Sequence, residues 1–244
     1  MADPDISVIV TAHREGILVG ATAQSAFAAI EVAAQAGLIC ELIVILDRAD
    51  DITTRTVRAC FGALARIFET DFGDPGLARN HGIQAANGIC ATFLDGDDLW
   101  SENWLVESWK VCSVRPDAVF HSACNLVFGV KRLLFWHIDS ELALCDHSFL
   151  NWYNYWDALS FARLGIYRRY PFRANNLNLR FGHEDWHWNA WTVSDGVPHK
   201  PTPGTMHFKR ARHGSQMGLV DAVGGIRWPL DGGELYPLGG TPRT

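Results

Sequence analysis

The feature that most constrains the fold is a short apolar run that ends in three carboxylates around one glycine. It reads Ile-Cys-Ala-Thr-Phe-Leu-Asp-Gly-Asp-Asp over residues 89–98, and its acidic residues are Asp95, Asp97 and Asp98. A continuous apolar run of this length predicts a strand buried on both faces, as in a parallel sheet. Open α/β sheets bind ligands beyond the carboxyl ends of their strands, so this acidic turn is predicted to lie at a ligand site.

Three carboxylates this close in sequence repel one another unless a cation or hydrogen-bond donors offset their charge. Hard oxygen ligands suit Mg²⁺ and Mn²⁺, so the turn predicts a divalent metal site for a phosphate-bearing ligand. The alternative interpretation is an acidic turn that caps a helix starting near Ser101, because Asp and Gly are ordinary cap and turn residues.

Strand-like and helix-like patterns alternate before the acidic turn. Strands are expected at 6–10, 41–46 and 66–69, and helices at 18–36, around 57–64 and at 74–88. Such alternation requires right-handed crossovers and a mainly parallel sheet with helices on both faces, which is an α/β fold. The loop at 11–15, Asp47 and the acidic turn should then converge at one edge of the sheet.

Composition fits an enzyme domain and excludes some partners. A chain of 244 residues with 48% hydrophobic content can bury a sizeable core. Its net charge of -6 argues against nucleic acid as a partner, since no basic stripe is available to neutralise phosphates.

The cysteines and the hydropathy pattern predict a cytoplasmic location. The six cysteines form no CxxC pair, which indicates small core residues in a reducing compartment. No signal segment and no uninterrupted apolar span of 18 residues is evident, so no transmembrane segment is expected. Peripheral membrane contact stays open.

Residues 74–98 resemble the helix, strand and DxD segment of family 2 glycosyltransferases, the inverting group with the GT-A fold. The family segment runs approximately as ARNxGIxxAxGxYIxFLDxDD. This chain matches it at Ala78-Arg79-Asn80, Gly82-Ile83, Ala86, Gly88 and Phe93-Leu94-Asp95-Gly96-Asp97-Asp98. The resemblance implies a Rossmann-like, mainly parallel central sheet with helices on both faces and a smaller mixed region on the acceptor side.

The resemblance also implies a nucleotide-sugar site in the first half. The first loop (Thr11, Ala12, His13 and Glu15) and Asp47 would hold the nucleoside. Asp95 would contact ribose or the metal, Gly96 would bind substrate, and Asp97 would ligate Mn²⁺ or Mg²⁺. Arg79 would lie at the nucleotide or brace the turn. The family usually has proline and an aromatic residue where this chain has Thr11 and His13.

The second half is expected to bind the acceptor. Tryptophan and tyrosine crowd this half, and their flat faces suit sugar rings, although aromatic side chains also build ordinary cores. The stretch Phe181-Gly182-His183-Glu184-Asp185-Trp186 resembles the family's GxED(W) element. By that resemblance Asp185 is the catalytic base, Glu184 orients the acceptor or braces the site, and Trp186 binds substrate. An isolated Glu-Asp pair would ordinarily only cap a helix.

Inverting transfer needs one carboxylate to deprotonate the attacking hydroxyl and a Lewis acid at the leaving group. Further along, residues 206–215 resemble the family's closing strand and an RxHxxS-like stretch, in which His213 would complete the metal shell. We therefore expect a donor-binding half at 1–115, an acceptor and catalytic-base half at 116–220, and an irregular tail at 221–244.

The predicted function is metal-dependent, inverting transfer of a sugar, with UDP-sugars favoured as donors, to a hydroxyl of a glycan or a lipid-linked acceptor. Polysaccharide biosynthesis is the expected setting. Two alternatives remain at this point: a nucleotidyltransferase acting on sugar phosphates, and a non-catalytic module that binds nucleotide sugars or glycans. A nucleotidyltransferase would normally carry a Gly-rich phosphate loop, which 11–16 matches poorly.

Overall fold

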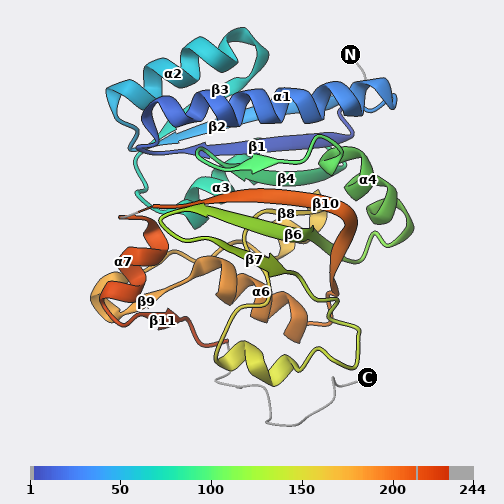
Figure 1. Cartoon of the computed structure of the whole chain (residues 1–244), viewed down its shortest axis with the longest axis vertical. Helices are drawn as coiled ribbons and strands as arrows, with labels where there is room; N and C mark the ends of the chain where they lie inside the picture. Colours follow the sequence, from blue (N-terminus) through green and yellow to red (C-terminus); the bar gives the residue numbers. More distant parts are fainter. Residues whose placement is uncertain (1–2, 213, 231–244) are drawn as a thin grey trace.

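One large mixed sheet forms the centre of the molecule, which we describe from a computed structural model covering residues 3–212 and 214–230 (Figure 1). The strands follow the order β3-β2-β1-β4-β8-β6-β10-β5, and β7 pairs with β6. They are β1 (Ile6–Ala12), β2 (Cys40–Asp47), β3 (Arg66–Thr70), β4 (Cys90–Asp95), β5 (Leu99–Trp100), β6 (Val119–Gly129), β7 (Leu133–Trp136), β8 (Ser160–Arg163) and β10 (His199–Ala211). A separate small sheet pairs β9 (Phe181–Gly182) with β11 (Ile226–Arg227).

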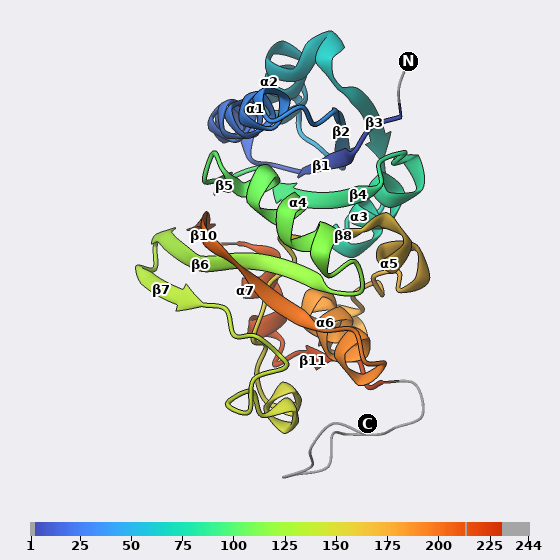
Figure 2. The same ribbon diagram turned by 90° about the vertical axis from the view of Figure 1, so that its right-hand side faces the viewer.

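Helices cover both faces of the large sheet. They are α1 (Val19–Gln35), α2 (Asp51–Phe61), α3 (Pro75–Ala85), α4 (Trp104–Val114), α5 (Leu164–Arg169), α6 (Glu184–Ser194) and α7 (Gln216–Ala222). Short 3₁₀ turns are η1 (Gly16–Leu18), η2 (Gly62–Leu64), η3 (His147–Asn151) and η4 (Leu177–Leu179). Along the long axis, α1 and α2 lie at one end, and α6 lies in the opposite half of the molecule, between the sheet and η3 (Figure 2).

The first half is the parallel part of the sheet. Strand β1 pairs in parallel with β2 and with β4, and β2 pairs in parallel with β3. In this register Thr11 lies beside Asp95, and Ala12 lies beside Leu46. The carboxyl ends of β1, β2 and β4 therefore meet at one edge, as the sequence predicts.

The second half makes the sheet mixed. Strand β8 runs antiparallel to β4 and to β6, whereas β10 runs parallel to β6. The end of β10 returns to the acidic turn, where His207 pairs with Trp100 and Phe208 with Leu99 in the antiparallel β5. This return brings the last long strand beside residues 95–98.

Side chains on the two faces of the sheet build two separate clusters. Val8 and Val10 face α1 and α4, while Ile9 faces α3 and buried aromatic residues of the second half. Because both faces of β1 are buried, apolar residues occur along it without alternation. A third cluster lies between α6 and the segment after β7, and it includes Leu150 and Trp156.

One helix in the described residues passes a test for a membrane span by length and composition alone. It runs over Gly16–Gln35, with a mean hydropathy of 1.5. It is not an uninterrupted apolar run, since it contains Gln24 and Glu31. Its alanine-rich face, including Ala26 and Ala29, is buried against the sheet, so we interpret it as a core helix.

Candidate active site

The acidic turn lies against the loop that follows β1. A Cβ on Gly96 would lie 3.0 Å from the carbonyl oxygen of Thr11 and 3.3 Å from Cγ of Glu15. Real Cβ atoms rarely approach other atoms this closely, so a glycine lets the two segments pack together. The neighbouring Ala12 is buried, and its side chain belongs to the core.

Asp95 ends β4 and is held as a carboxylate. Its Oδ1 accepts hydrogen bonds from the Thr11 hydroxyl (3.0 Å) and from Nη2 of Arg79 (2.9 Å). Burial alone would raise the pKa of Asp95, but the charges of Arg79 and Lys209 outweigh it, and the pKa lies below its ordinary value. Asp95 therefore stays ionised at neutral pH.

Arg79 connects the donor side of the site with the acceptor side. It lies in α3, which Asp74 caps by accepting from Leu77 N, with Pro75 in the first turn. Its side chain is only 3% exposed, and Nη1 donates to Oε1 of Glu184 at 2.8 Å. One guanidinium thus joins the end of β4 to the first turn of α6, because its two terminal nitrogens donate to different carboxylates.

Asp97 pairs with a different basic side chain, that of Arg212. Its Oδ2 lies 2.8 Å from Nε of Arg212, whose Nη2 lies 2.9 Å from Oε1 of Glu15. Burial, with the charges of Asp95 and Glu15, raises the pKa of Asp97 to about 6 despite Arg212. Burial and the neighbouring carboxylates therefore outweigh the guanidinium that contacts Asp97.

Asp98 braces the turn and does not face the same partners. It is buried, and its Oδ1 accepts from the backbone N–H of Arg210 at 2.7 Å. Its backbone carbonyl accepts from the Thr22 hydroxyl. Nζ of Lys209 lies 3.9 Å from its Oδ2. Asp98 thus ties the turn to β10 and α1.

Asp185 lies in the first turn of α6, next to Glu184. Its Oδ1 accepts from its neighbour Trp186 N at 2.8 Å, and Nδ2 of Asn154 lies 3.5 Å from Oδ2. Burial and the charge of Glu184 raise the pKa of Asp185 to about 7, although Lys209 and Arg79 act in the opposite direction. A carboxylate poised near neutral pH suits a general base.

The residue before Glu184 has an unusual backbone. His183 has φ 56°, in the left-handed region that side chains other than glycine rarely adopt. Such a conformation costs about 1–3 kcal/mol and is common at functional sites. Downstream, the indole N–H of Trp186 donates to the carbonyl of Leu150 at 2.7 Å, which fixes that ring against η3.

Asp47 lies at the end of β2, at the same edge. The residue is 5% exposed, and its carboxylate accepts from the Thr70 hydroxyl (3.0 Å) and from the backbone N–H groups of Phe72 (2.7 Å) and Asp74 (3.0 Å). Its backbone carbonyl lies 2.6 Å from Nδ1 of His13. Asp47 thus shapes the loop after β3, and its contact with a nucleobase stays a prediction.

The residues at the acidic turn fit a divalent cation. Among the described residues, the carboxylates of Glu15, Asp95, Asp97 and Asp98 meet the cations of Arg79, Arg212 and Lys209, and the pKa of Asp97 is raised by burial and by Asp95 and Glu15. Oxygen-only donors from Asp95 and Asp97 match the preference of Mg²⁺ and Mn²⁺. His213, the third ligand predicted from sequence, lies outside the described residues.

Sequence reasoning missed two basic residues at the acidic turn, one near the end of β10 and one just after it. Lys209 and Arg212 were both visible in the stretch that resembles the closing strand of the family, but only His213 was assigned a role there. Asn154 was missed as well, because it belongs to a segment with no recognisable motif. The sheet pairing of β10 with β5 is what brings Lys209 and Arg212 to the acidic turn.

The sequence model for Glycosyl transferase family 2 matches residues 7–183, which is more than half of the chain. The chain belongs to this family. The match begins in β1 and contains the acidic turn and Arg79, so the resemblance read from residues 74–98 is confirmed. No curated protein sequence is similar enough to count as a relative.

Solved structures show that this family member has the GT-A fold of known glycosyltransferases. The S. aureus TarS 1-349 structure in complex with UDP-GlcNAc is 17% identical, with a TM-score of 0.59, over 87% of this chain and 60% of that chain. The mannosyltransferase PcManGT from Pyrobaculum calidifontis, in complex with GDP-Man and Mn²⁺, is 16% identical, with a TM-score of 0.61, over 88% of this chain and 59% of that chain. This chain therefore spans about 60% of the length of these neighbours.

Proposed function

We propose that this protein is a metal-dependent, inverting glycosyltransferase. It transfers a sugar from a nucleoside diphosphate sugar to a hydroxyl group of a glycan or a lipid-linked acceptor. The observation that carries the proposal is the double bridge of Arg79 from Asp95 to Glu184, with Asp185 next in the chain. The bridge ties Asp95, on the side proposed to bind the sugar donor, to Glu184, the neighbour of the candidate base.

The donor side holds the diphosphate and its metal. Asp95 and Asp97 would hold Mn²⁺ or Mg²⁺, and the bound ion would supply Lewis-acid stabilisation to the leaving diphosphate. Arg212 already lies at Asp97, where its guanidinium can also pair with phosphate oxygens. The proposal favours UDP-sugars, and the similarity to a structure holding UDP-GlcNAc supports a nucleotide sugar as donor.

Asp185 takes the proton on the acceptor side. As the acceptor hydroxyl attacks the anomeric carbon, Asp185 accepts its proton from the face opposite the leaving group, so that the configuration at this carbon inverts. Arg79 and Lys209 limit how far burial raises the pKa of Asp185, so a useful fraction is ionised near pH 7. Glu184, held by Arg79, positions the start of α6.

The acceptor half exposes apolar side chains that support a lipid-linked acceptor or peripheral membrane contact. Strand β7 and the segment after η3 present large exposed residues: Leu133, Leu134, Trp136, Trp152 and Tyr153. The exposed Lys131 and Arg132 precede them. Apolar patches beside basic side chains suit an anionic lipid surface. We further propose a cytoplasmic location, supported by six free cysteines.

A donor panel on three proteins tests the proposal. UDP-, GDP-, CDP- and dTDP-sugars are assayed for transfer and for a thermal shift with Mn²⁺, Mg²⁺ or EDTA, on wild type, Asp97→Asn and Asp185→Asn. One donor should stabilise the wild type only with metal, by mass action. Asp97→Asn should lose that shift, whereas Asp185→Asn should keep it and lose transfer by at least about 100-fold.

The matched control is Asp195→Asn, which changes an exposed aspartate just past the other end of α6. It should retain both transfer and the thermal shift. Full transfer activity in Asp185→Asn would refute the assignment of the base. A donor shift that is unchanged by EDTA would refute the metal dependence.

A further inference from the structure

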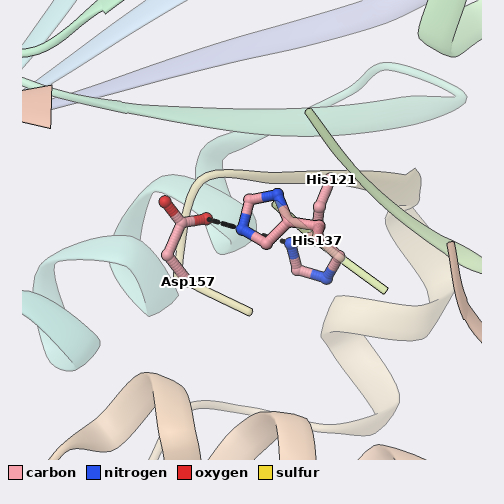
Figure 3. A group of neighbouring side chains, drawn as sticks. All are labelled: His121, His137 and Asp157. Atoms are coloured by element: carbon pink, nitrogen blue, oxygen red, sulfur yellow. Dashed lines mark ion pairs between the residues drawn. The ribbon is translucent and has the colours of Figure 1, made fainter. Parts of the chain in front are cut away.

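A buried group of two histidines and one aspartate lies behind the acidic turn. His121 comes from β6, His137 directly follows β7, and Asp157 precedes β8. The Asp157 carboxylate faces both imidazole rings (Figure 3). Its Oδ1 lies 3.9 Å from Nδ1 of His121 and 3.9 Å from Nε2 of His137, and the three atoms all lie within 4.8 Å of one another. Both histidine side chains are fully buried.

The hydrogen bond of His137 fixes which of its nitrogens can bind a ligand. Its Nδ1 lies 2.7 Å from the carbonyl oxygen of Ser122, and a carbonyl only accepts, so Nδ1 carries the proton. In the neutral ring, Nε2 then carries no proton and presents a lone pair. It has no hydrogen-bond partner among the described residues, and it faces Asp157.

A chain of hydrogen bonds fixes which ring nitrogen of His121 carries the proton. The Thr192 hydroxyl donates to the carbonyl of Trp188 at 2.8 Å, so it accepts from Nε2 of His199 at 2.8 Å. Nδ1 of His199 then accepts from Nε2 of His121 at 2.9 Å. This assigns a lone pair to Nδ1 of His121, which is buried and has no hydrogen-bond partner in the described part of the chain.

Two lone pairs therefore converge on one carboxylate oxygen in a buried space. Protonation of the rings would relieve the repulsion, but burial lowers the pKa of His121 and lowers that of His137 to about 4. Neutral rings are the form that binds metals, and backbone or side-chain acceptors on the opposite nitrogens are the usual way to orient such ligands. Lys209 pairs with the other oxygen of Asp157, so a metal ion between the two ring nitrogens and Oδ1 is the group that would satisfy all three atoms.

We propose that His121 Nδ1, His137 Nε2 and Asp157 Oδ1 form a second metal site, for a divalent transition metal of the Zn²⁺ type. Imidazole nitrogens with one carboxylate suit Zn²⁺, whereas the all-oxygen set at Asp95 and Asp97 suits Mg²⁺ or Mn²⁺. Ligand distances of about 2.0–2.1 Å place tetrahedral donor atoms roughly 3.4 Å apart, so the observed 3.9 Å requires side-chain shifts of about half an ångström.

The site would stiffen the support of the acidic turn. The other oxygen of Asp157 accepts from Nδ2 of Asn125 at 2.7 Å and lies 3.0 Å from Nζ of Lys209. Lys209 in turn reaches towards Asp98. A metal on Asp157 Oδ1 would fix the carboxylate that positions Lys209, so we assign the site a positioning role. The inference does not depend on the proposed sugar transfer.

Metal content and spectroscopy on the full chain test this site directly. The protein is stripped with a chelator, equilibrated with Zn²⁺ or with Co²⁺ as a spectroscopic probe, desalted and analysed for bound metal. Wild type and Asp97→Asn should each retain one Zn²⁺, and Co²⁺ should give the visible absorption of a low-coordinate nitrogen and oxygen site. His137→Gln should lose the bound metal and that absorption.

The matched control is His207→Gln, which removes another buried histidine on β10 that stands outside the group. It should bind Zn²⁺ as the wild type does. His199→Gln keeps all three ligands but breaks the orienting chain, so its affinity should fall about 10–100-fold. This variant keeps the test valid if His137→Gln does not fold. No bound Zn²⁺ in wild type, or equal binding in His137→Gln, would overturn the proposal.

Discussion

Removing Arg79 should be the most destabilising change in the candidate active site. In Arg79→Met the two carboxylates that the guanidinium holds, Asp95 and Glu184, lose their partner. Arg79 is 3% exposed and Glu184 is 9% exposed, so water cannot replace the lost contacts at that end. Breaking a buried pair by deleting one partner costs about 3–5 kcal/mol. The side chain of Asp95 is 29% exposed, which moves our expectation towards about 3 kcal/mol.

The loss of unfolding free energy in Arg79→Met should depend on pH in a defined direction. The pKa of Asp95 lies below its ordinary value in the folded wild type, so this ion pair stabilises the protein above the unfolded pKa and stops doing so as the pH falls through the folded pKa. In Arg79→Met, burial acts without that guanidinium, and the pKa of Asp95 should rise. The variant should therefore be destabilised most at about pH 7.5 and less near about pH 4.5, where the carboxylate takes up a proton.

Urea unfolding followed by tryptophan fluorescence measures both effects at the two pH values. Arg58→Met is the matched control, because Arg58 pairs with Glu69 on the surface and both side chains are more than half exposed. Its loss should stay below about 1 kcal/mol. The reasoning fails if Arg79→Met costs no more than Arg58→Met, or if it costs the same at both pH values.

Three further predictions concern the pH dependence of transfer and two substitutions of the backbone-critical residues Gly82 and His183. The kcat/KM for transfer should rise with pH through an apparent pKa near 7, because burial raises the pKa of Asp185 to about 7 and a base must be ionised; a profile flat from about pH 5 to about pH 8 would contradict its role. Gly82→Ala should lose about 1–3 kcal/mol of unfolding free energy, since a Cβ there overlaps Ile9, whereas Gly165→Ala, with open space around its Cβ, should lose none. His183→Gly should be more stable than His183→Ala by about 1 kcal/mol, because only glycine relieves the left-handed backbone; equal stability in urea would show that the backbone is not strained.

Local patterns predicted the first half of the fold well. The helix expected at 18–36 is α1, at Val19–Gln35, and most of its expected buried face is buried, including Thr22 and Ala33. Helix periodicity is a local property, so sequence alone reveals it. The helix expected near Ser101 begins three residues later, at Trp104, because Leu99 and Trp100 pair with a strand more than a hundred residues away. Such non-local pairing has no sequence period.

The candidate site was predicted where its residues are contiguous or belong to one motif. Asp95, Asp97 and Gly96 follow one another, and all three lie where the acidic turn was expected. Asp98 shares the motif but is turned into the protein, because a turn sends successive side chains in different directions. The bridge from Arg79 to Glu184 joins residues far apart in sequence, so its two ends were identified separately and its existence was not.

The buried histidines were invisible to sequence analysis for a physical reason. Metal sites are recognised from sequence when two ligands lie on one turn or one helix face, as in short Cys or His pairs. His121, His137 and Asp157 come from three segments that meet only through the pairing of β6 with β7 and with β8. His183 and His187 lie four residues apart, a spacing that suits two metal ligands on one helix face, but His183 precedes α6 in a left-handed conformation.

Strand β10 connects the two sites, and that connection has a thermodynamic consequence. His199 at its start orients His121, Lys209 near its end pairs with Asp157, and the backbone of Arg210 holds Asp98 of the acidic turn. A metal that fixes Asp157 should thus favour the same position of β10 that donor binding requires. Coupling between two binding sites is reciprocal, so Zn²⁺ should raise donor affinity by the same factor by which the donor raises Zn²⁺ affinity. Unequal factors would mean that one ligand also binds at the other's site.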